Sequence, residues 1–298
     1  MKKNNLTLTT IFMSLLLIGG NILTSCNNDD NQSKESRTGT EILSSTAWVT
    51  SAVIDQNNVN IDRGTVPGAN YVGYAYYKTD GTFRIVSLQD QPRIAGKWEL
   101  IDNDTKRRLT IIRNDTTVVA EVDIVTLKNN LFTYRAIPDR SNPTSFFNVE
   151  HIPTNHKEPS TPAEVLASVN WTTTKVSDIT NGAANAVELD KAVAPASNFF
   201  GDAYYVNSNG SAYFPVDNQG RFTNGTFRIT DSGSNQARIS GDWYVSLDGR
   251  QRTLRFRNAA GVELERVVSI FELTPTKFTY DVTIDGGRIL RAEHEPIR

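Results

Sequence analysis

Arginine is the residue that recurs in this chain with a spacing suited to binding chemistry. Three pairs stand at equivalent places in two halves of the sequence: Arg84 and Arg228, Arg93 and Arg238, Arg107 and Arg252. A guanidinium can grip a carboxylate or another anion through two parallel hydrogen bonds. The alternative is pairing with acids on neighbouring strands and stacking on the tryptophans that also recur. We take the first two pairs as candidate ligand-binding arginines.

Tyrosine recurs beside these arginines. Tyr76 and Tyr77 in the first half match Tyr204 and Tyr205 in the second. Neighbours on a strand point to opposite faces, so one tyrosine of each pair must leave the core face. A tyrosine-lined barrel mouth would bind a small apolar or glycan ligand, whereas packing in the core and rim is the alternative. All four tyrosines are candidate ligand-binding residues.

Residues suited to catalysis or metal binding form no recognisable set. The histidines are His151, His156 and His294, and zinc sites usually need three or four nitrogen or sulfur ligands. Glu150 and His151 are adjacent, so regular strand geometry turns them to opposite faces. No Gly-x-Ser-x-Gly motif is visible, and the acids are scattered. We therefore expect no catalytic residue, no metal and no cofactor.

Cys26 is the one cysteine, and its surroundings are specific. Lys2 and Lys3 precede a short apolar stretch at 11–18, which ends in Leu23-Thr24-Ser25-Cys26. The stretch is too short to span a bilayer as a helix, which needs ~20 residues, and it fits a signal peptide. The motif resembles the lipobox of bacterial lipoproteins. That resemblance implies a signal peptide at 1–25, lipid on Cys26 and attachment to a membrane; an ordinary secretory signal with a chance cysteine is the alternative.

The residues that follow the lipobox are polar, and they predict a flexible tether at residues 26–40. Asp29 and Asp30 resemble the surface-export signal of Bacteroidetes lipoproteins, although a plain solvated linker explains them as well. We expect a lipid-anchored protein of the cell envelope, in the outer membrane and exposed at the surface if the export resemblance holds.

Charge excludes one class of partner. The chain has 31 Lys and Arg against 33 Asp and Glu, a formal net charge of −2. A nucleic-acid-binding protein would concentrate basic residues on one face, and this sequence shows no such excess. We therefore expect no nucleic-acid partner.

An internal repeat organises the rest of the chain. The recurring blocks are 41–45 with 164–168, 48 with 171, 73–77 with 201–205, 80–85 with 224–229, 93–98 with 238–243, 107 and 109 with 252 and 254, 132–134 with 278–280, and 150–151 with 293–294. The order of the blocks is kept. We expect a first domain at 41–152, a proline-rich linker at 153–162 and a second domain at 163–298, which carries an inserted hairpin or long loop between Tyr205 and Asn224.

Each repeat alternates apolar and polar residues with a period of two, as at 81–87 and 97–101. Turn signals separate about eight such segments per copy, which favours an all-β barrel or sandwich. Closure into a barrel also removes exposed strand edges. The helix candidates are short, at Thr40–Ser44 and Pro162–Ser168, with Thr161 as N-cap and Glu164 in the first turn.

A set of these blocks resembles a known family. The set comprises Trp48, Asp80-Gly81-Thr82-Phe83, Gly96-Lys97-Trp98, Arg107-Arg108-Leu109 and Phe132-Thr133-Tyr134. It is similar to the lipocalin-like lipoprotein domains of Bacteroidetes, and more closely to a domain-of-unknown-function family often found there in two copies. The resemblance implies two tandem antiparallel calycin-type β-barrels of about eight strands each. It brings no established substrate or catalytic residue.

These observations favour a non-enzymatic, lipid-anchored envelope protein whose barrels bind a small ligand or an envelope partner. One alternative is an interaction module with filled barrels and no ligand. Another is an envelope enzyme acting on glycans. A cavity lined by tyrosines with an arginine at depth would favour the first.

Overall fold

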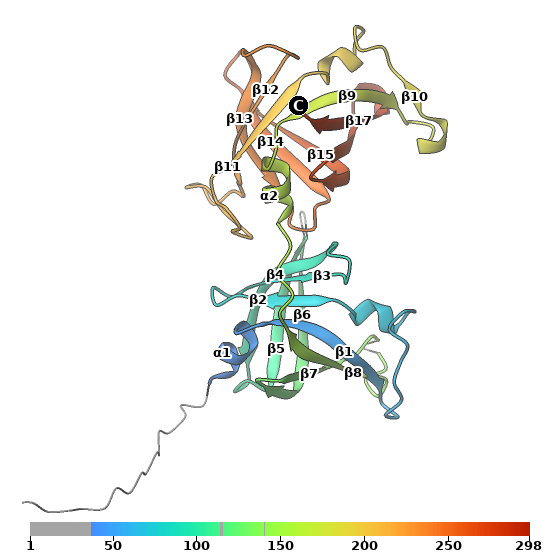
Figure 1. Ribbon diagram of the computed structural model, residues 1–298, viewed down its shortest axis with the longest axis vertical. Coiled ribbons are helices and arrows are strands. Elements are labelled where there is room, and N and C mark those ends of the chain that lie inside the picture. The colour runs from blue at the N-terminus through green and yellow to red at the C-terminus, as the bar shows by residue number, and fades with distance from the viewer. Residues whose placement is uncertain (1–36, 114–115, 140) are drawn as a thin grey trace, which may run out of the picture. The chain divides into compact units, whose positions relative to one another are not determined.

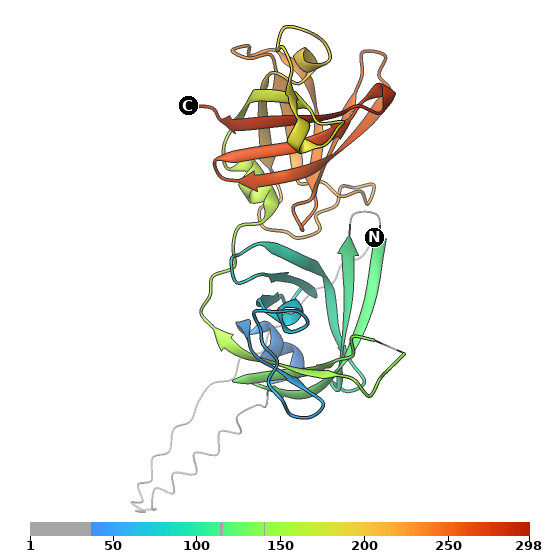
Figure 2. The ribbon, with the colours of Figure 1, turned by 90° about the vertical axis from the view of Figure 1, so that its right-hand side faces the viewer.

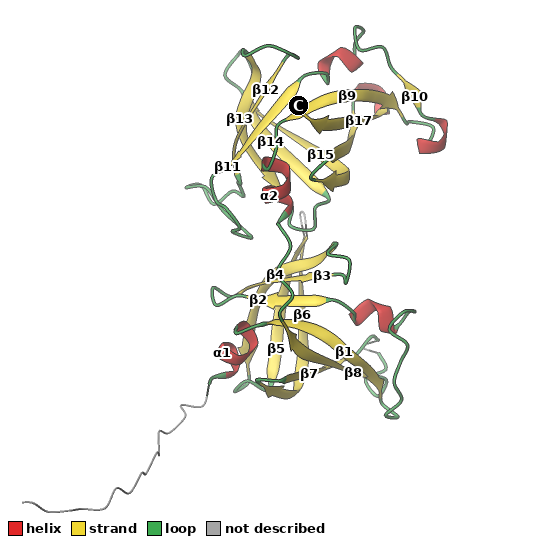
Figure 3. Cartoon of the chain, in the orientation of Figure 1, coloured by secondary structure: helices red, strands yellow, loops and turns green. Residues whose placement is uncertain are grey.

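The computed structural model describes residues 37–113, 116–139 and 141–298, and strands account for most of them (Figures 1 and 3). Cys26, the signal peptide and most of the tether expected from the sequence lie outside these residues. No helix within the described ranges combines the length and the apolar character needed to cross a membrane. The all-β class predicted from the sequence is confirmed, with two short α-helices in the described part of the chain.

The first repeat forms a closed antiparallel barrel in which each strand pairs with its neighbour in sequence and β8 pairs with β1. Its strands are β1 (Ala47–Asp55), β2 (Tyr74–Tyr77), β3 (Thr82–Val86), β4 (Pro92–Ile101), β5 (Lys106–Arg113), β6 (Thr116–Lys128), β7 (Leu131–Ala136) and β8 (Phe147–Thr154). The 3₁₀ helix η1 (Gly68–Tyr71) lies in the long connection between β1 and β2. Because the barrel closes, the set has no free edge.

The second repeat has the same topology. Its barrel strands are β9 (Trp171–Asp178), β11 (Asp202–Asn207), β12 (Gly225–Thr230), β13 (Ala237–Val245), β14 (Gln251–Arg257), β15 (Glu263–Thr274), β16 (Lys277–Thr283) and β17 (Ile289–Pro296). Pairing of β17 with β9 closes the barrel (Figure 2). The two-residue strand β10 (Val187–Glu188) adds to β9 outside the ring, and the 3₁₀ helices are η2 (Ala183–Asn185), η3 (Ala196–Asn198) and η4 (Asp285–Gly287). Residues 208–224, predicted as an inserted hairpin or loop, form a loop with one bridge, between Val216 and Phe222.

A short capped helix precedes each barrel: α1 (Gly39–Ser44) and α2 (Pro162–Ala167). In α2 the Thr161 hydroxyl accepts from the Glu164 amide and the Glu164 carboxylate accepts from the Thr161 amide. This reciprocal capping satisfies two backbone donors that a helix start leaves free. Thr161 therefore acts as the N-cap, as predicted.

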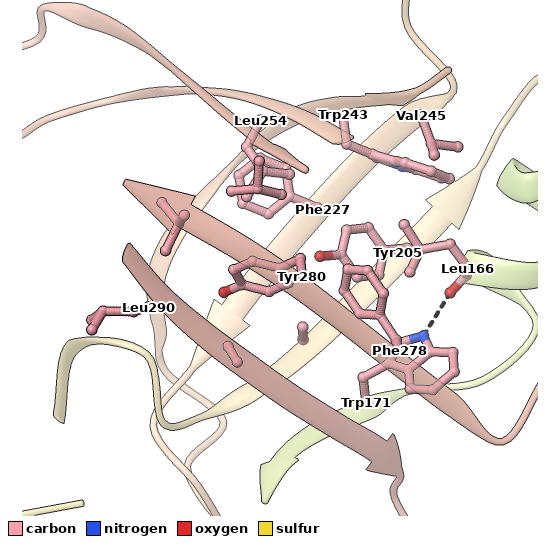
Figure 4. Close-up of a cluster of buried hydrophobic side chains, with 14 of the residues drawn as sticks. Leu166, Trp171, Tyr205, Phe227, Trp243, Val245, Leu254, Phe278, Tyr280 and Leu290 are labelled. Atoms are coloured by element: carbon pink, nitrogen blue, oxygen red, sulfur yellow. Dashed lines mark hydrogen bonds between the residues drawn. The ribbon is translucent and has the colours of Figure 1, made fainter. Parts of the chain in front are cut away.

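Each helix is tied to the barrel core by a buried tryptophan. The indole nitrogen of Trp171 donates to the Leu166 carbonyl at 2.8 Å (Figure 4), and Trp48 donates to Leu43 at 2.9 Å. All four side chains are fully buried. The bond uses a helix carbonyl that lacks a partner within its own helix, so the tryptophan fixes the helix and fills the core together.

A β-bulge sets the direction of side chains near the middle of the first strand. The pairing of β1 with β8 shifts between Thr50 and Ala52, and the pairing of β9 with β17 shifts next to Thr173. A bulge inserts a residue and reverses the alternation of faces beyond it. Thr50 lies before the bulge and faces the barrel interior in phase with Trp48, opposite His151, whereas beyond the bulge Val53 rather than Ala52 is buried. Thr173 likewise stands opposite His294.

Candidate functional site

The interior of the first barrel contains a cavity of about 270 Å³. Its wall is largely aliphatic and comes from strands β3 to β6: Ile85, Ile94, Leu109, Ile111 and Val122. The β1–β2 connection contributes Asn70, Tyr71 and Gly73 at one side. The volume is just below the ~300–1,000 Å³ typical of small-molecule sites.

Arg107 lines this cavity from β5 although its side chain is buried, with 2% of the residue surface exposed. Its guanidinium donates to the Tyr77 hydroxyl and lies over the Tyr134 ring, 4.4 Å from the ring centroid. The Phe132 ring is 5.2 Å away. Among the described residues, the Nε atom of Arg107 finds no hydrogen-bond partner.

No acidic side chain lines the cavity beside this cation. The adjacent Arg108 points outward and pairs with Glu99 at 2.8 Å and Glu121 at 2.7 Å. Arg107 has no such ion pair with any described residue. Burial of an uncompensated charge is costly, and charged side chains are rarely buried unless they are paired. The interior of the barrel is therefore an electropositive site whose charge is not balanced within the described protein.

His151 stands beside Arg107 without adding to that charge. Burial, and then the charge of Arg107, lower its pKa to about 3, so the imidazole is neutral at pH 7. The Thr50 hydroxyl donates to the Tyr71 carbonyl at 2.8 Å, so it must accept from His151 Nε2, 3.2 Å away. Nδ1 of His151 is buried and has no partner among the described residues.

The hydroxyls around Arg107 are neutral as well. Burial raises the pKa of Tyr77 to about 12 and also raises the pKa of Tyr134, while Arg107 opposes both shifts. Neither phenol is ionised near pH 7. The cluster therefore offers hydrogen-bond donors and one fixed positive charge, but no group that would act as a general base at neutral pH.

The second barrel repeats the cluster. Arg252, 2% exposed, donates to the Tyr205 hydroxyl, lies 4.4 Å from the Tyr280 ring centroid and leaves Nε without a described partner. Burial, and then the charge of Arg252, lower the pKa of His294 to about 3. Figure 4 shows Tyr205 and Tyr280 inside the barrel next to Phe278, and the adjoining cavity measures about 260 Å³.

The two cavities correspond position by position. Every residue that lines the second cavity occupies the place of a residue that lines the first, and only two pairs differ: Tyr71 with Phe199 and Ala120 with Arg266. Outward-facing positions on the same strands differ, as with Arg108 and Thr253. The two repeats thus retain the shared lining of the cavity, whereas their outer surfaces keep some positions, such as Tyr76 with Tyr204, and change others.

Arg93 and Arg238, predicted as ligand-binding residues, both line the cavities. The Arg93 guanidinium donates to the carbonyls of Asn70, at 2.8 Å, and Val72. It therefore fixes the β1–β2 connection at the cavity. In the second barrel Arg238 pairs instead with Asp231 at 3.1 Å.

The four predicted tyrosines divide between the two faces of their strands. Tyr77 and Tyr205 face the interior and contact the buried arginines. Tyr76 faces outward and its hydroxyl lies 2.6 Å from His156 Nδ1, in the segment after β8. Tyr204 stacks with Arg228, whose guanidinium carbon lies 4.3 Å from the ring centroid on the outer side of the second barrel.

Arg84 and Arg228, also predicted as ligand-binding residues, are not brought to the cavities. Arg84 is buried, but by the segment after β8, where its guanidinium donates to the carbonyls of Pro159 at 2.7 Å and Ser160 at 3.2 Å. It secures that segment to the outside of the first barrel.

Three pairs at the centre of the clusters were not among the predicted site residues: Arg107 with Arg252, Tyr134 with Tyr280, and His151 with His294. All three recur in the repeat, and that recurrence was the available signal. Arg107 shares its strand face with Leu109, so the alternation also placed it toward the core. An arginine that shares a strand face with core residues, as Arg107 does, therefore indicated a residue of the barrel interior.

Within the ranges that the structure covers, no group of three or more His, Cys, Asp or Glu side chains is arranged to hold a metal ion. The clusters in the barrels instead combine one arginine, two tyrosines, one histidine and one threonine, from five strands of each barrel. This set of groups is suited to holding a small anion.

Comparison with known families matches residues 40–161 to a domain of unknown function, DUF4822. This range contains the first barrel and the segment that follows it. Among solved structures, a protein of unknown function from the DUF3598 family of Nostoc punctiforme is 10% identical, with 88% of this chain and 100% of that chain covered at a TM-score of 0.21. No curated protein matches the chain.

Proposed function

We propose that each barrel binds a small organic carboxylate, whose negative charge rests against the buried arginine. The observation that carries the proposal is the position of Arg107, which lines a cavity without a described acidic partner, and the recurrence of that arrangement at Arg252. A carboxylate is the natural partner of a guanidinium, because hydrogen bonds between charged groups are about twice as strong as neutral ones.

The cavity wall indicates the rest of the ligand. Away from Arg107, most of the wall of the first cavity consists of isoleucine, leucine, valine and alanine side chains, with Arg93, Asn70 and Tyr71 at the side of the β1–β2 connection. An apolar body would bury its surface there at roughly 25 cal/mol per Å². A volume of about 270 Å³ suits a short chain or a single ring rather than a long fatty acid. The proposed ligand is therefore a compact carboxylate with an apolar body.

Titration calorimetry with hexanoate tests this proposal. The probe has one carboxylate and a short flexible tail, and hexanamide is a neutral control of the same shape. We expect hexanoate to bind at two sites per chain and hexanamide to bind at neither. Arg107→Met and Arg252→Met should each remove one site. Failure of folded protein to bind hexanoate at either site would overturn the proposal.

We also propose that the protein is a bacterial lipoprotein with lipocalin-like domains, that it is anchored by lipid on Cys26 and that it lies in the cell envelope. The support for the anchor is the lipobox resemblance at Leu23–Cys26. A lipid-anchored binding protein would hold its ligand at the membrane surface. Expression of the full chain and of Cys26→Ser tests the anchor: the wild type should fractionate with membranes and the variant should not. Membrane association that survives Cys26→Ser would contradict it.

A further inference from the structure

One position adds an arginine to the wall of the second cavity. Leu109 pairs with Ala120 across β5 and β6 of the first barrel, and its counterpart Leu254 pairs with Arg266 across β14 and β15. Ala120 and Arg266 both line their cavities. The second cavity therefore has a further arginine where the first has a methyl group.

Arg266 lies near Arg252 on the adjacent strand. Arg252 pairs with Val268, two residues along from Arg266, so the two arginines are diagonal neighbours on one face of the sheet. Such neighbours have Cα atoms ~7–8 Å apart, within reach of a ligand that extends between two long side chains. Arg266 is exposed, and its guanidinium carbon lies 5.8 Å from the Phe256 ring centroid.

Arg93 and Arg238 line both cavities, and only Arg238 has a described acid beside it, Asp231 at 3.1 Å. The Arg93 guanidinium donates instead to backbone carbonyls of the β1–β2 connection. With Asp231 counted, the two linings have the same net charge, and they differ in where the charge lies, because Arg266 adds a guanidinium on the strand next to Arg252. Arg266 forms no ion pair with a described residue, and no acid lines the second cavity. Besides Arg238, whose charge Asp231 balances, a ligand in that cavity would meet the deeply buried guanidinium of Arg252 and the guanidinium of Arg266 nearer to solvent.

We propose that the second barrel selects an anion with two separated negative charges, a dicarboxylate, whereas the first barrel selects a monocarboxylate. This inference rests on the proposed function. Arg252 would hold one charge at depth and Arg266 the other toward the opening. Arg266 is thus the residue that determines the difference in specificity between the two sites.

Matched probes test the selection. Hexanoate and adipate both have six carbons and differ only by the second carboxylate, and butyl phosphate, with its negative charges at one end, is the control for charge spacing. Binding is measured by calorimetry in the Cys26→Ser chain without its signal peptide. Arg107→Met isolates the second site and Arg252→Met isolates the first. We expect the second site to prefer adipate over hexanoate by about tenfold, ~1.4 kcal/mol, and the first to prefer hexanoate. If butyl phosphate binds the second site more tightly than adipate, the two arginines do not hold separate charges and the inference is overturned.

A reciprocal exchange then assigns the preference to one residue. Arg266→Ala should abolish the preference of the second site while hexanoate still binds, and Arg266→Lys should keep part of it. Ala120→Arg should create the preference in the first site. If both sites bind hexanoate and Arg266→Ala leaves the dianion preference unchanged, the inference is overturned and the proposed function stands. If folded protein binds none of the three probes, the proposed function fails.

Discussion

The guanidinium carbon of Arg107 lies 4.4 Å from the centre of the Tyr134 ring, and Arg252 keeps the same distance from Tyr280. An aromatic face stabilises a desolvated cation by about 2 kcal/mol. Removing an ion from water costs several kcal/mol even after the protein relaxes. The ring therefore offsets only part of the cost of burial, and an anion in the cavity would offset more of it.

Arg107→Met should make the ligand-free protein more stable. Methionine fills a similar volume without a buried charge. Replacing even a buried ion pair with packed apolar residues often stabilises by about 1–4 kcal/mol, and Arg107 has no partner charge among the described residues that the change would leave behind. Loss of the hydrogen bond to Tyr77 opposes this gain. We expect a net increase of about 1 kcal/mol in the free energy of unfolding, measured by urea denaturation.

Arg108→Met is the matched control for that substitution, because Arg108 is the neighbouring residue on β5 but is exposed and paired with Glu99 and Glu121. Surface ion pairs contribute ~0–1 kcal/mol, so this variant should lose up to that amount. A large loss of stability in Arg107→Met, beyond that of the control, would show that Arg107 is structural.

The two buried histidines should make the protein lose stability as the pH falls. Both have folded-state pKa values of about 3, below the ordinary value of 6.5, so between these values the unfolded chain binds more protons. Their contribution is complete above pH 6.5. It decreases as the pH falls toward 3, by up to about 1.4 kcal/mol per pH unit for each histidine.

Urea denaturation between pH 6.5 and 4.5 measures this slope, in a range where most carboxylates are still ionised. His151→Gln should lower the slope by about half of the histidine contribution, and His151→Gln with His294→Gln should remove it. An unchanged slope in the double variant would contradict burial of the neutral imidazoles.

Trp48→Phe should destabilise the first barrel by about 2–4 kcal/mol. The change removes the hydrogen bond from the indole to the Leu43 carbonyl and leaves a cavity in a fully buried site. Trp171→Phe should have a similar effect on the second barrel, through Leu166. Hydrogen exchange should show faster exchange in the strands of the affected barrel. Equal exchange in both barrels of either variant would argue against the separate anchoring of each helix.

Gly96→Ala should be among the most damaging small substitutions in the first barrel. A Cβ atom there would lie 1.9 Å from the Thr110 carbonyl oxygen, which is backbone of the neighbouring strand. We expect a loss of about 3 kcal/mol in thermal or urea unfolding. Gly64→Ala is the control, because its Cβ would meet only the end of the Asp62 side chain, at 3.3 Å. Similar losses in both variants would contradict the close approach of β4 and β5.

The period-two pattern and the repeat were sufficient to predict the barrels, because alternation and turn chemistry are local properties of the sequence. The bulge beside Thr50 was not predictable, since it depends on how β1 pairs with β8, a strand about a hundred residues away. The direction of the tyrosines at 76–77 was not predictable either. Alternation required one of them to face inward but did not specify which one.

The arginines show where the prediction of the site was limited. Arg84 and Arg107 are both buried, and both recur in the repeat. Arg84 is covered by the segment that follows β8, whereas Arg107 faces the cavity. The burial of Arg84 depends on the path of a distant segment, which residue types alone do not give. The strand phase that Arg107 shares with Leu109 was the information available to separate them.

The most direct test of the account is nuclear magnetic resonance of hexanoate labelled with ¹³C at its carboxyl carbon, added to the Cys26→Ser chain produced without its signal peptide. The account predicts two bound carboxyl resonances, which disappear one at a time in Arg107→Met and Arg252→Met. Bound resonances that persist in both variants, or a single free resonance in the presence of folded protein, would contradict the claim that the buried arginines hold a carboxylate.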